Sequence, residues 1–216
     1  MFTKYGYTTI GVTAIISFLL IVAGLYVSHN IAKYSFYLIA IFLLTFTLYF
    51  FRDPDRTVPG KDNIIVSPAD GRVLFVKQIV DEKFIGGNAT QISIFMSPLN
   101  VHVNRIPISG KVVYLKYYEG RYVAAFEDEA SDTNERSVTG IINPNGKILF
   151  TQVAGFIARR IINELNIDDT VTIGERFGMI KFGSRVDVLA PLNWIPRVNK
   201  DENVTAGETI LFELAD

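Results

Sequence analysis

Cysteine is absent from this chain of 216 residues, and the sequence contains only two histidines. The lack of cysteine excludes disulfides, thiol nucleophiles and cysteine-ligated metal ions, and it is compatible with a cytosolic domain. Acidic residues are missing from residues 1–51, where Lys4 and Lys33 are the only fixed charges. The remaining 19 cations and all 22 acids fall in residues 52–216, which indicates an ordinary soluble surface without a basic face for nucleic acid.

Two long apolar runs fill the acid-free part, Ile10 to Val27 and Tyr34 to Phe51. At about 1.5 Å per residue, each run can span most of a hydrocarbon core of roughly 30 Å. Cations beyond both outer ends of the pair favour cytoplasmic termini. The sequence therefore predicts a membrane-associated hydrophobic hairpin over residues 1–51 and a separate domain over 52–216. A cleaved signal peptide and a re-entrant or surface-lying hairpin are the alternatives.

The pattern from residue 52 onward is mainly β. One helix is predicted from Gly155 to Asn166, because its apolar residues lie on one stripe: Ile157, Ile161, Ile162 and Leu165. Asn143-Pro144-Asn145-Gly146 predicts a hairpin turn. Many short strands separated by glycines favour a compact domain like a barrel-sandwich hybrid, with one or two helices. The predicted strands are Asn63–Val66, Arg72–Val80, Thr90–Met96, Lys111–Tyr118, Ser137–Ile142, Lys147–Val153, Thr170–Ile173, Arg176–Phe182, Arg185–Leu189 and Thr209–Leu214.

Three places in this domain combine residue types that could carry chemistry. Gly183-Ser184 joins two predicted strands, and a serine hydroxyl next to a glycine carbonyl could convert that amide into an ester. His102 is the domain's only histidine, the side-chain type that titrates near neutrality. Asp70 follows a predicted strand and could orient or polarise a histidine. Each also has a purely structural interpretation: a loop dipeptide, a satisfied buried histidine and a turn aspartate.

In order and spacing, these residues resemble the pyruvoyl-dependent phosphatidylserine decarboxylases, specifically the short proenzyme type. The resemblance covers nearly the whole chain. It rests on the apolar hairpin and on Arg52-Asp53-Pro54, Ser67-Pro68-Ala69-Asp70-Gly71, Asn100-Val101-His102-Val103-Asn104-Arg105-Ile106-Pro107 and Phe182-Gly183-Ser184-Arg185-Val186-Asp187. The match implies that Ser184 attacks the Gly183 carbonyl and that the chain splits into a β chain, 1–183, and an α chain, 184–216.

The same resemblance implies a cofactor made from the chain itself. Ser184 would become a pyruvoyl group, form a Schiff base with the substrate amine and accept electrons as CO2 leaves, with no metal. Ser184, His102 and Asp70 are the implied catalytic residues, with His102 as proton donor. Longer relatives have a His-x-x-His-x-Pro pattern whose second histidine serves self-cleavage, whereas Arg105 stands there in this chain. Either His102 serves both steps, or strain and oxyanion stabilisation drive cleavage with Asp70 acting more directly.

Substrate and location follow from the resemblance as expectations. The substrate would be phosphatidylserine, or archaetidylserine in its place, and the enzyme would lie at the cell membrane with its catalytic domain on the cytoplasmic side. The two chains would form an α/β heterodimer, with higher oligomers left open, and no nucleic acid is expected as a partner. The rival interpretations are a non-catalytic membrane-anchored barrel-sandwich binding module and a serine hydrolase, but the second lacks a Gly-x-Ser-x-Gly elbow around Ser184.

Overall fold

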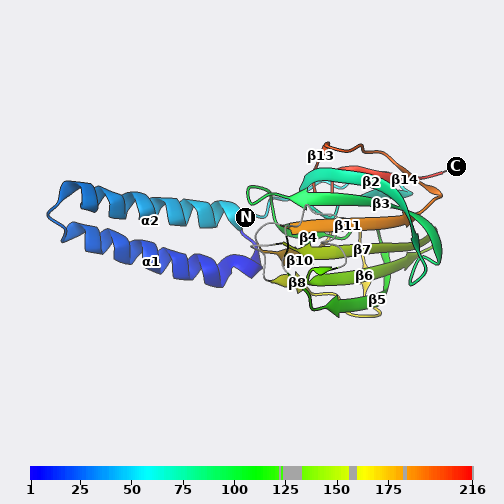
Figure 1. Ribbon diagram of the computed structural model, residues 1–216, viewed down its shortest axis with the longest axis horizontal. Coiled ribbons are helices and arrows are strands. Elements are labelled where there is room, and N and C mark those ends of the chain that lie inside the picture. The colour runs from blue at the N-terminus through cyan, green and yellow to red at the C-terminus, as the bar shows by residue number, and fades with distance from the viewer. Residues whose placement is uncertain (122, 124–132, 156–159, 182–183, 216) are drawn as a thin grey trace. The chain divides into compact units, whose positions relative to one another are not determined.

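The structure is a computed structural model that describes residues 1–121, 123, 133–155, 160–181 and 184–215. The chain forms two compact units, Met1–Asp55 and Arg56–Asp216. The two labelled helices belong to the first unit and all the labelled strands to the second (Figure 1). A mainly β architecture preceded by an apolar helical hairpin is therefore confirmed.

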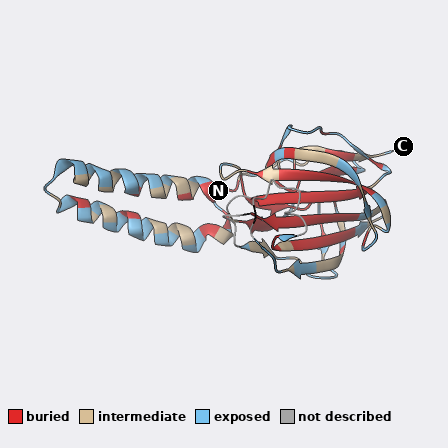
Figure 2. Cartoon of the chain, in the orientation of Figure 1, coloured by how far each residue is buried: buried red, intermediate tan, exposed pale blue. Residues whose placement is uncertain are grey.

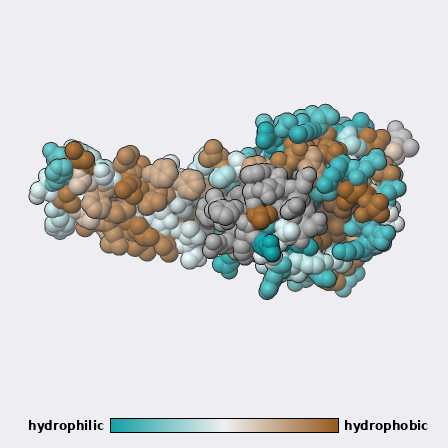
Figure 3. Space-filling model, in the orientation of Figure 1, coloured by the Kyte–Doolittle hydropathy of each residue, from teal (hydrophilic) through white to brown (hydrophobic). Residues whose placement is uncertain are grey.

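Two long helices make up most of the first unit. These are α1 (Tyr7–Leu25) and α2 (Asn30–Phe50), and the short 3-10 helix η1 (Lys4–Gly6) precedes them. Small residues let the helices approach closely: the Tyr37 ring packs where a side chain on Gly24 would lie, and Ser17 Oγ donates to the Ala40 carbonyl at 3.1 Å. Both helices are long and apolar enough to cross a membrane. Their outward surface is mostly hydrophobic (Figure 3).

Antiparallel strands build the second unit. The largest sheet has the order β13-β2-β3-β11-β7-β6-β5-β9, and two three-stranded sheets have the orders β1-β14-β12 and β4-β10-β8. The strands are β1 (Ile64–Val66), β2 (Gly71–Asp81), β3 (Gly87–Met96), β4 (Val103–Arg105), β5 (Gly110–Tyr118), β6 (Arg136–Asn143), β7 (Gly146–Ala154), β8 (Ile161–Asn163), β9 (Thr170–Val171), β10 (Arg176–Ile180), β11 (Ser184–Pro191), β12 (Trp194–Pro196), β13 (Asn203–Val204) and β14 (Ile210–Leu214).

Alternation along β11 separates the two faces of the large sheet, because successive side chains of a strand point to opposite sides. Val186 and Val188 lie in the main hydrophobic core, which also takes side chains from the two smaller sheets. Leu189 lies in a second, smaller cluster with Phe84. Both faces of the central strands are largely buried (Figure 2). Ser184 shares the alternation of Val186, so its side chain faces the main core.

The predicted helix from Gly155 to Asn166 is wrong over its described part. Residues 156–159 lie outside the described residues, and Ile161–Asn163 form β8, which pairs with β10. The β-branched residues Ile161 and Ile162 suit a strand as well as a helix, and pairing with an available edge decides between them. The segment that follows His102, where no strand was predicted, contains the short strand β4. The turn at residues 143–146 is confirmed, since Asn143 pairs with Gly146 across it.

Candidate active site

Ser184 is the first residue of β11, and it is fully buried. It pairs with Met96 of β3 on one side and with Ala154 of β7 on the other. Its hydroxyl donates to Met96 Sδ at 3.3 Å, a weak contact because a thioether sulfur is a poor acceptor. Phe182 and Gly183 lie outside the described residues. The structure therefore holds the predicted nucleophile firmly between two strands at the point where its strand begins.

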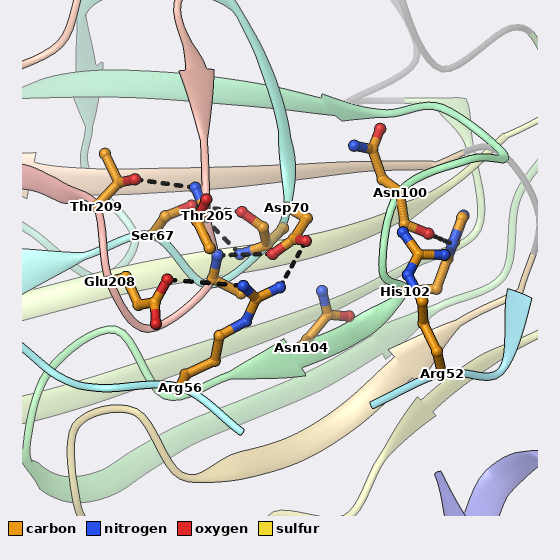
Figure 4. A network of polar contacts seen from close by, with 12 residues as sticks. Arg52, Arg56, Ser67, Asp70, Asn100, His102, Asn104, Thr205, Glu208 and Thr209 are labelled. Carbon is orange, nitrogen blue, oxygen red and sulfur yellow. Dashed lines mark hydrogen bonds and ion pairs between the residues drawn. The ribbon is translucent and has the colours of Figure 1, made fainter. Parts of the chain in front are cut away.

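His102 precedes β4 and is also fully buried. Its Nδ1 lies 2.9 Å from the Asn100 carbonyl oxygen (Figure 4). Because a carbonyl can only accept, Nδ1 carries the proton in the neutral ring and Nε2 carries the lone pair. The Ile180 N–H donates to the His102 carbonyl at 3.4 Å. This contact fixes the histidine beside the end of β10, the strand that leads into Ser184.

Lys181 begins the link between β10 and β11. Its backbone N–H donates to the Arg160 carbonyl at 3.2 Å. Burial and, to a smaller extent, the positive charge of Arg160 lower the pKa of the Lys181 amine below its ordinary value. The described start of this link is therefore partly withdrawn from water.

Asp70 lies in the tight turn between β1 and β2. Its carboxylate accepts a hydrogen bond of 2.8 Å from Arg56 Nη2 and another of 2.8 Å from the Ala206 N–H. Figure 4 shows Asp70 directed at Arg56, whereas His102 lies apart beside Asn100. The structure thus brings His102 to the link that precedes Ser184, but it gives Asp70 different partners from those of His102.

Comparison with known proteins identifies the family. The family model described as phosphatidylserine decarboxylase matches residues 43–212. The chain is 45% identical to the phosphatidylserine decarboxylase proenzyme of Chlorobium phaeovibrioides, over 100% of this chain and 97% of that protein. It is 48% identical to the proenzyme of Chlorobium limicola, over 98% and 99% of the two chains, and 42% identical to that of Prosthecochloris aestuarii, over 99% and 98%.

The chain belongs to the phosphatidylserine decarboxylase family.

Arg105 occupies the position of the second histidine in the His-x-x-His-x-Pro pattern. Its Nη1 donates to the Gly174 carbonyl at 2.9 Å, and its backbone N–H donates to the Pro68 carbonyl at 2.9 Å. Alternation on β4 directs Arg105 and Asn104 to opposite sides. Arg105 therefore ties β4 to neighbouring turns, while Asn104 is the β4 residue that faces Met96.

A buried amide pair beside Ser184 escaped the sequence-based prediction. Gln152 of β7 donates to Asn104 Oδ1 at 2.9 Å, and Asn104 Nδ2 lies 3.8 Å from Met96 Sδ, the same sulfur that accepts from Ser184. One signal was available, because Gln152 interrupts the apolar end of β7 at a position that alternation directs into the core. Its partner could not be read from the sequence.

The opposite face of the large sheet holds a different polar group. Arg185 and Asp187 form a buried ion pair, with Nε–Oδ1 at 3.0 Å, and Ser93 Oγ donates to Asp187 Oδ1 at 2.5 Å. A groove of about 490 Å³ lies on this face, with Asp187, Phe84 and Leu189 among its described lining residues. The Ser184 hydroxyl faces the core side, so this groove is separate from the Ser184 site.

Proposed function

We propose that this chain is the proenzyme of an enzyme that decarboxylates phosphatidylserine to phosphatidylethanolamine and CO2 after cutting itself between Gly183 and Ser184. The observation that carries the proposal is the placement of Ser184. It is fully buried at the head of a strand that is paired on both sides, inside a motif that resembles the family's cleavage site. Relatives named as such proenzymes match the chain over nearly its full length.

Self-cleavage uses the chain's own groups. Ser184 Oγ adds to the Gly183 carbonyl carbon, and the nitrogen of residue 184 leaves as a free amine when the ester forms. Elimination then breaks the Cβ–Oγ bond of residue 184 and releases Gly183 as a carboxylate. Throughout, β3 and β7 hold β11 in place. The α chain, 184–216, and the β chain, 1–183, stay together as an α/β heterodimer because β11, β13 and β14 pair with strands of the β chain.

The dehydroalanine left at position 184 would take up water and release ammonia to become a pyruvoyl group, which would condense with the substrate amine and accept the electrons left behind by CO2. The buried head of β11 fits a group made from a serine side chain, since no separate cofactor has to enter. His102 supplies the proton chemistry in this proposal, both in cleavage and in returning a proton to the product carbon. Its Nδ1 is held by the Asn100 carbonyl, so Nε2 takes and gives the proton.

In this proposal Asp70 is a positioning residue: it holds a turn in place and does not contact His102 through its assigned hydrogen bonds. It fixes its turn to Arg56 and to the Ala206 N–H. The Pro68 carbonyl of the same turn accepts hydrogen bonds from the Arg105 N–H and from Asn104 Nδ2. The turn therefore supports β4, which in turn places His102.

The helical hairpin of the first unit would anchor the enzyme in the cell membrane. Cations at both ends of the hairpin, Lys4 and Arg52, favour a cytoplasmic location for both ends and hence for the catalytic unit. The headgroup does not distinguish the two candidate substrates, because phosphatidylserine and archaetidylserine present the same serine headgroup to the site and differ in their lipid tails. Assay of both lipids with the matured enzyme separates these two substrates.

Intact mass spectrometry of the purified chain beside Ser184→Ala and His102→Ala tests the proposal. We expect the wild type to give two chains that meet at Gly183/Ser184, the smaller one blocked to Edman degradation, and Ser184→Ala to remain whole. His102→Ala should slow both cleavage and turnover. A wild-type chain that stays whole and unmodified would sink the proposal and favour the binding module, and normal cleavage with normal turnover in His102→Ala would remove that residue's roles.

A further inference from the structure

The Asn104–Gln152 pair has no part in the chemistry assigned so far, although it lies fully buried beside Ser184. The exposed fractions of the two residues are 0% and 1%. Burying two carboxamides costs free energy unless their polar atoms are hydrogen-bonded. Gln152 Oε1 lacks a hydrogen-bond partner in the described structure, so part of this cost is left uncompensated among the described residues.

Fixed backbone carbonyls determine which way both amides point. Gln152 Nε2 donates to the Ile162 carbonyl at 3.2 Å, and because a carbonyl can only accept, the nitrogen of Gln152 must face that side. The same nitrogen lies 2.9 Å from Asn104, which must therefore present Oδ1 to it. Asn104 Nδ2 is thereby turned the other way, toward the Pro68 carbonyl at 3.4 Å and Met96 Sδ at 3.8 Å.

Asn104 Nδ2 and Ser184 Oγ converge on one sulfur atom. Ser184 Oγ lies 3.3 Å from Met96 Sδ, and Asn104 Nδ2 lies 3.8 Å from it. Sulfur accepts hydrogen bonds weakly, and the remaining contact of Nδ2, at 3.4 Å, is long for an N–H···O bond. Asn104 therefore aims a strongly polar N–H donor, satisfied only by long contacts among the described residues, at the immediate surroundings of Ser184 Oγ.

Self-cleavage creates the charge that such a donor could stabilise. In the elimination step a base removes the Cα proton of residue 184, that bond's electrons form the Cα=Cβ double bond, and the Cβ–Oγ bond breaks. Oγ then leaves as one oxygen of the Gly183 carboxylate and takes up negative charge. A preorganised N–H aimed at an oxygen that becomes negative lowers the barrier of that step, and removal of one such donor slows a reaction by about 100-fold to 1,000-fold.

We propose that Asn104 is a catalytic residue of self-cleavage, whose Nδ2–H donates to Ser184 Oγ as this oxygen departs in the elimination step, with Gln152 holding the amide in the required orientation. This assignment rests on the proposed cleavage at Gly183–Ser184. It adds to that reaction a residue on the face of β4 opposite to Arg105.

The ester that precedes elimination provides the test. Full-length wild type, Asn104→Leu and Asn163→Leu are purified and followed by intact mass spectrometry, with and without hydroxylamine. Hydroxylamine attacks the ester carbonyl of Gly183 and frees an α chain with an unblocked Ser184. Asn163 is the matched control, because its half-buried amide donates to the Ser137 and Thr139 hydroxyls at 3.0 Å, partners different from those of Asn104.

We expect the wild type and Asn163→Leu to mature alike, and Asn104→Leu to form the ester but eliminate about 100-fold more slowly. Hydroxylamine should then split Asn104→Leu into two chains with a free Ser184 amine. If Asn104→Leu matures at the rate of Asn163→Leu, the inference about Asn104 is overturned while the proposed function stands. The same holds if Asn104→Leu folds like the control but hydroxylamine does not split it, because no ester has then formed. A wild type that never cleaves overturns the proposed function as well. If Asn104→Leu does not fold, Asn104→Ala, which adds no bulk, replaces it.

Discussion

At the scale of single residues, Asp70 shows how a sequence motif and its geometry can assign different roles. The motif suggests a carboxylate that orients a histidine, but the carboxylate contacts Arg56 and the Ala206 N–H instead. The side chains of Asp70 and Arg56 are only 14% and 15% exposed, so their ion pair is little screened by water. The contacts of Asp70 therefore favour a role in anchoring the turn that supports β4 over a role in orienting His102.

Paired substitutions distinguish anchoring from chemistry. We expect Asp70→Asn and Arg56→Met each to lower the free energy of unfolding by about 1–2 kcal/mol, since each breaks the charged hydrogen bond between Asp70 and Arg56, and Arg56→Met also removes a longer ion pair with Glu208. Both should slow self-cleavage to a similar extent. Denaturant unfolding is measured in the Ser184→Ala background, which keeps one chain, and cleavage rates are measured with Ser184 intact. Loss of cleavage in Asp70→Asn with normal cleavage in Arg56→Met would instead make the carboxylate a direct participant.

At the scale of elements, the alternation of apolar and polar residues made many of the strands predictable. The contacts between strands that are distant in the sequence were not predictable. The strands around Ser184 were expected within a few residues of their observed bounds, because their apolar residues repeat with period two. Ile161 and Ile162 fit both the helical period of about 3.6 residues and the strand period of two. Their pairing with β10 is a tertiary interaction that the local sequence pattern does not predict. The Asn104–Gln152 contact spans 48 positions, so no local signal joins its two ends.

The β2–β3 hairpin offers an element-scale prediction. Phe84 from this hairpin packs on β6, where a side chain on Gly140 would come within 2.5–2.9 Å of the Phe84 ring. We expect Phe84→Ala to cost about 3 kcal/mol of stability because a buried ring is removed. Gly140→Ala should also destabilise the unit, but much less when Phe84 is already alanine. Unfolding of the four combinations in the Ser184→Ala background measures this coupling, and purely additive costs would contradict the packing.

The edge of the β1-β14-β12 sheet should respond to acid. Glu213 of β14 contacts Lys61 at 3.3 Å and Arg197 at 2.5 Å. The hydrogen bond from Lys61, assisted by the charge of Arg197, lowers the pKa of the Glu213 carboxyl. A lowered pKa in the folded state adds stability above the unfolded-state value, and that stability is lost as the pH falls through the folded-state value.

Glu213→Gln should therefore reduce the loss of stability on acidification, relative to wild type, in the range below the ordinary pKa of glutamate. The measurement is denaturant unfolding as a function of pH in the Ser184→Ala background. Glu82→Gln is the control, since Glu82 is an exposed acid in the β2–β3 turn. Identical acid dependence in Glu213→Gln and wild type would show that these contacts do not act in solution.

At the scale of the whole molecule, the candidate site residues and the long apolar helices lie in different units of the chain. Ser184, His102 and Asn104 all lie in Arg56–Asp216, so self-cleavage should need no part of the hairpin. The hairpin has the length and composition of a membrane anchor, and Phe18 and Phe42 near the middle of its helices are 65% and 64% exposed. Outside a membrane, such surface would be a strongly unfavourable exposure of apolar area.

A charge placed in the middle of either helix tests the anchor. We expect Phe18→Asp and Phe42→Asp to weaken the association of the full chain with phosphatidylethanolamine–phosphatidylglycerol vesicles in flotation, because an aspartate at a helix centre costs about 3 kcal/mol on insertion. Cleavage at Gly183–Ser184 should proceed as in wild type. Leu192→Asp, at an exposed position of the second unit, is the control and should float like wild type. If both helix variants float unchanged, the second unit itself binds the lipid surface; if they float poorly and also fail to cleave, maturation depends on the membrane rather than on the β unit alone.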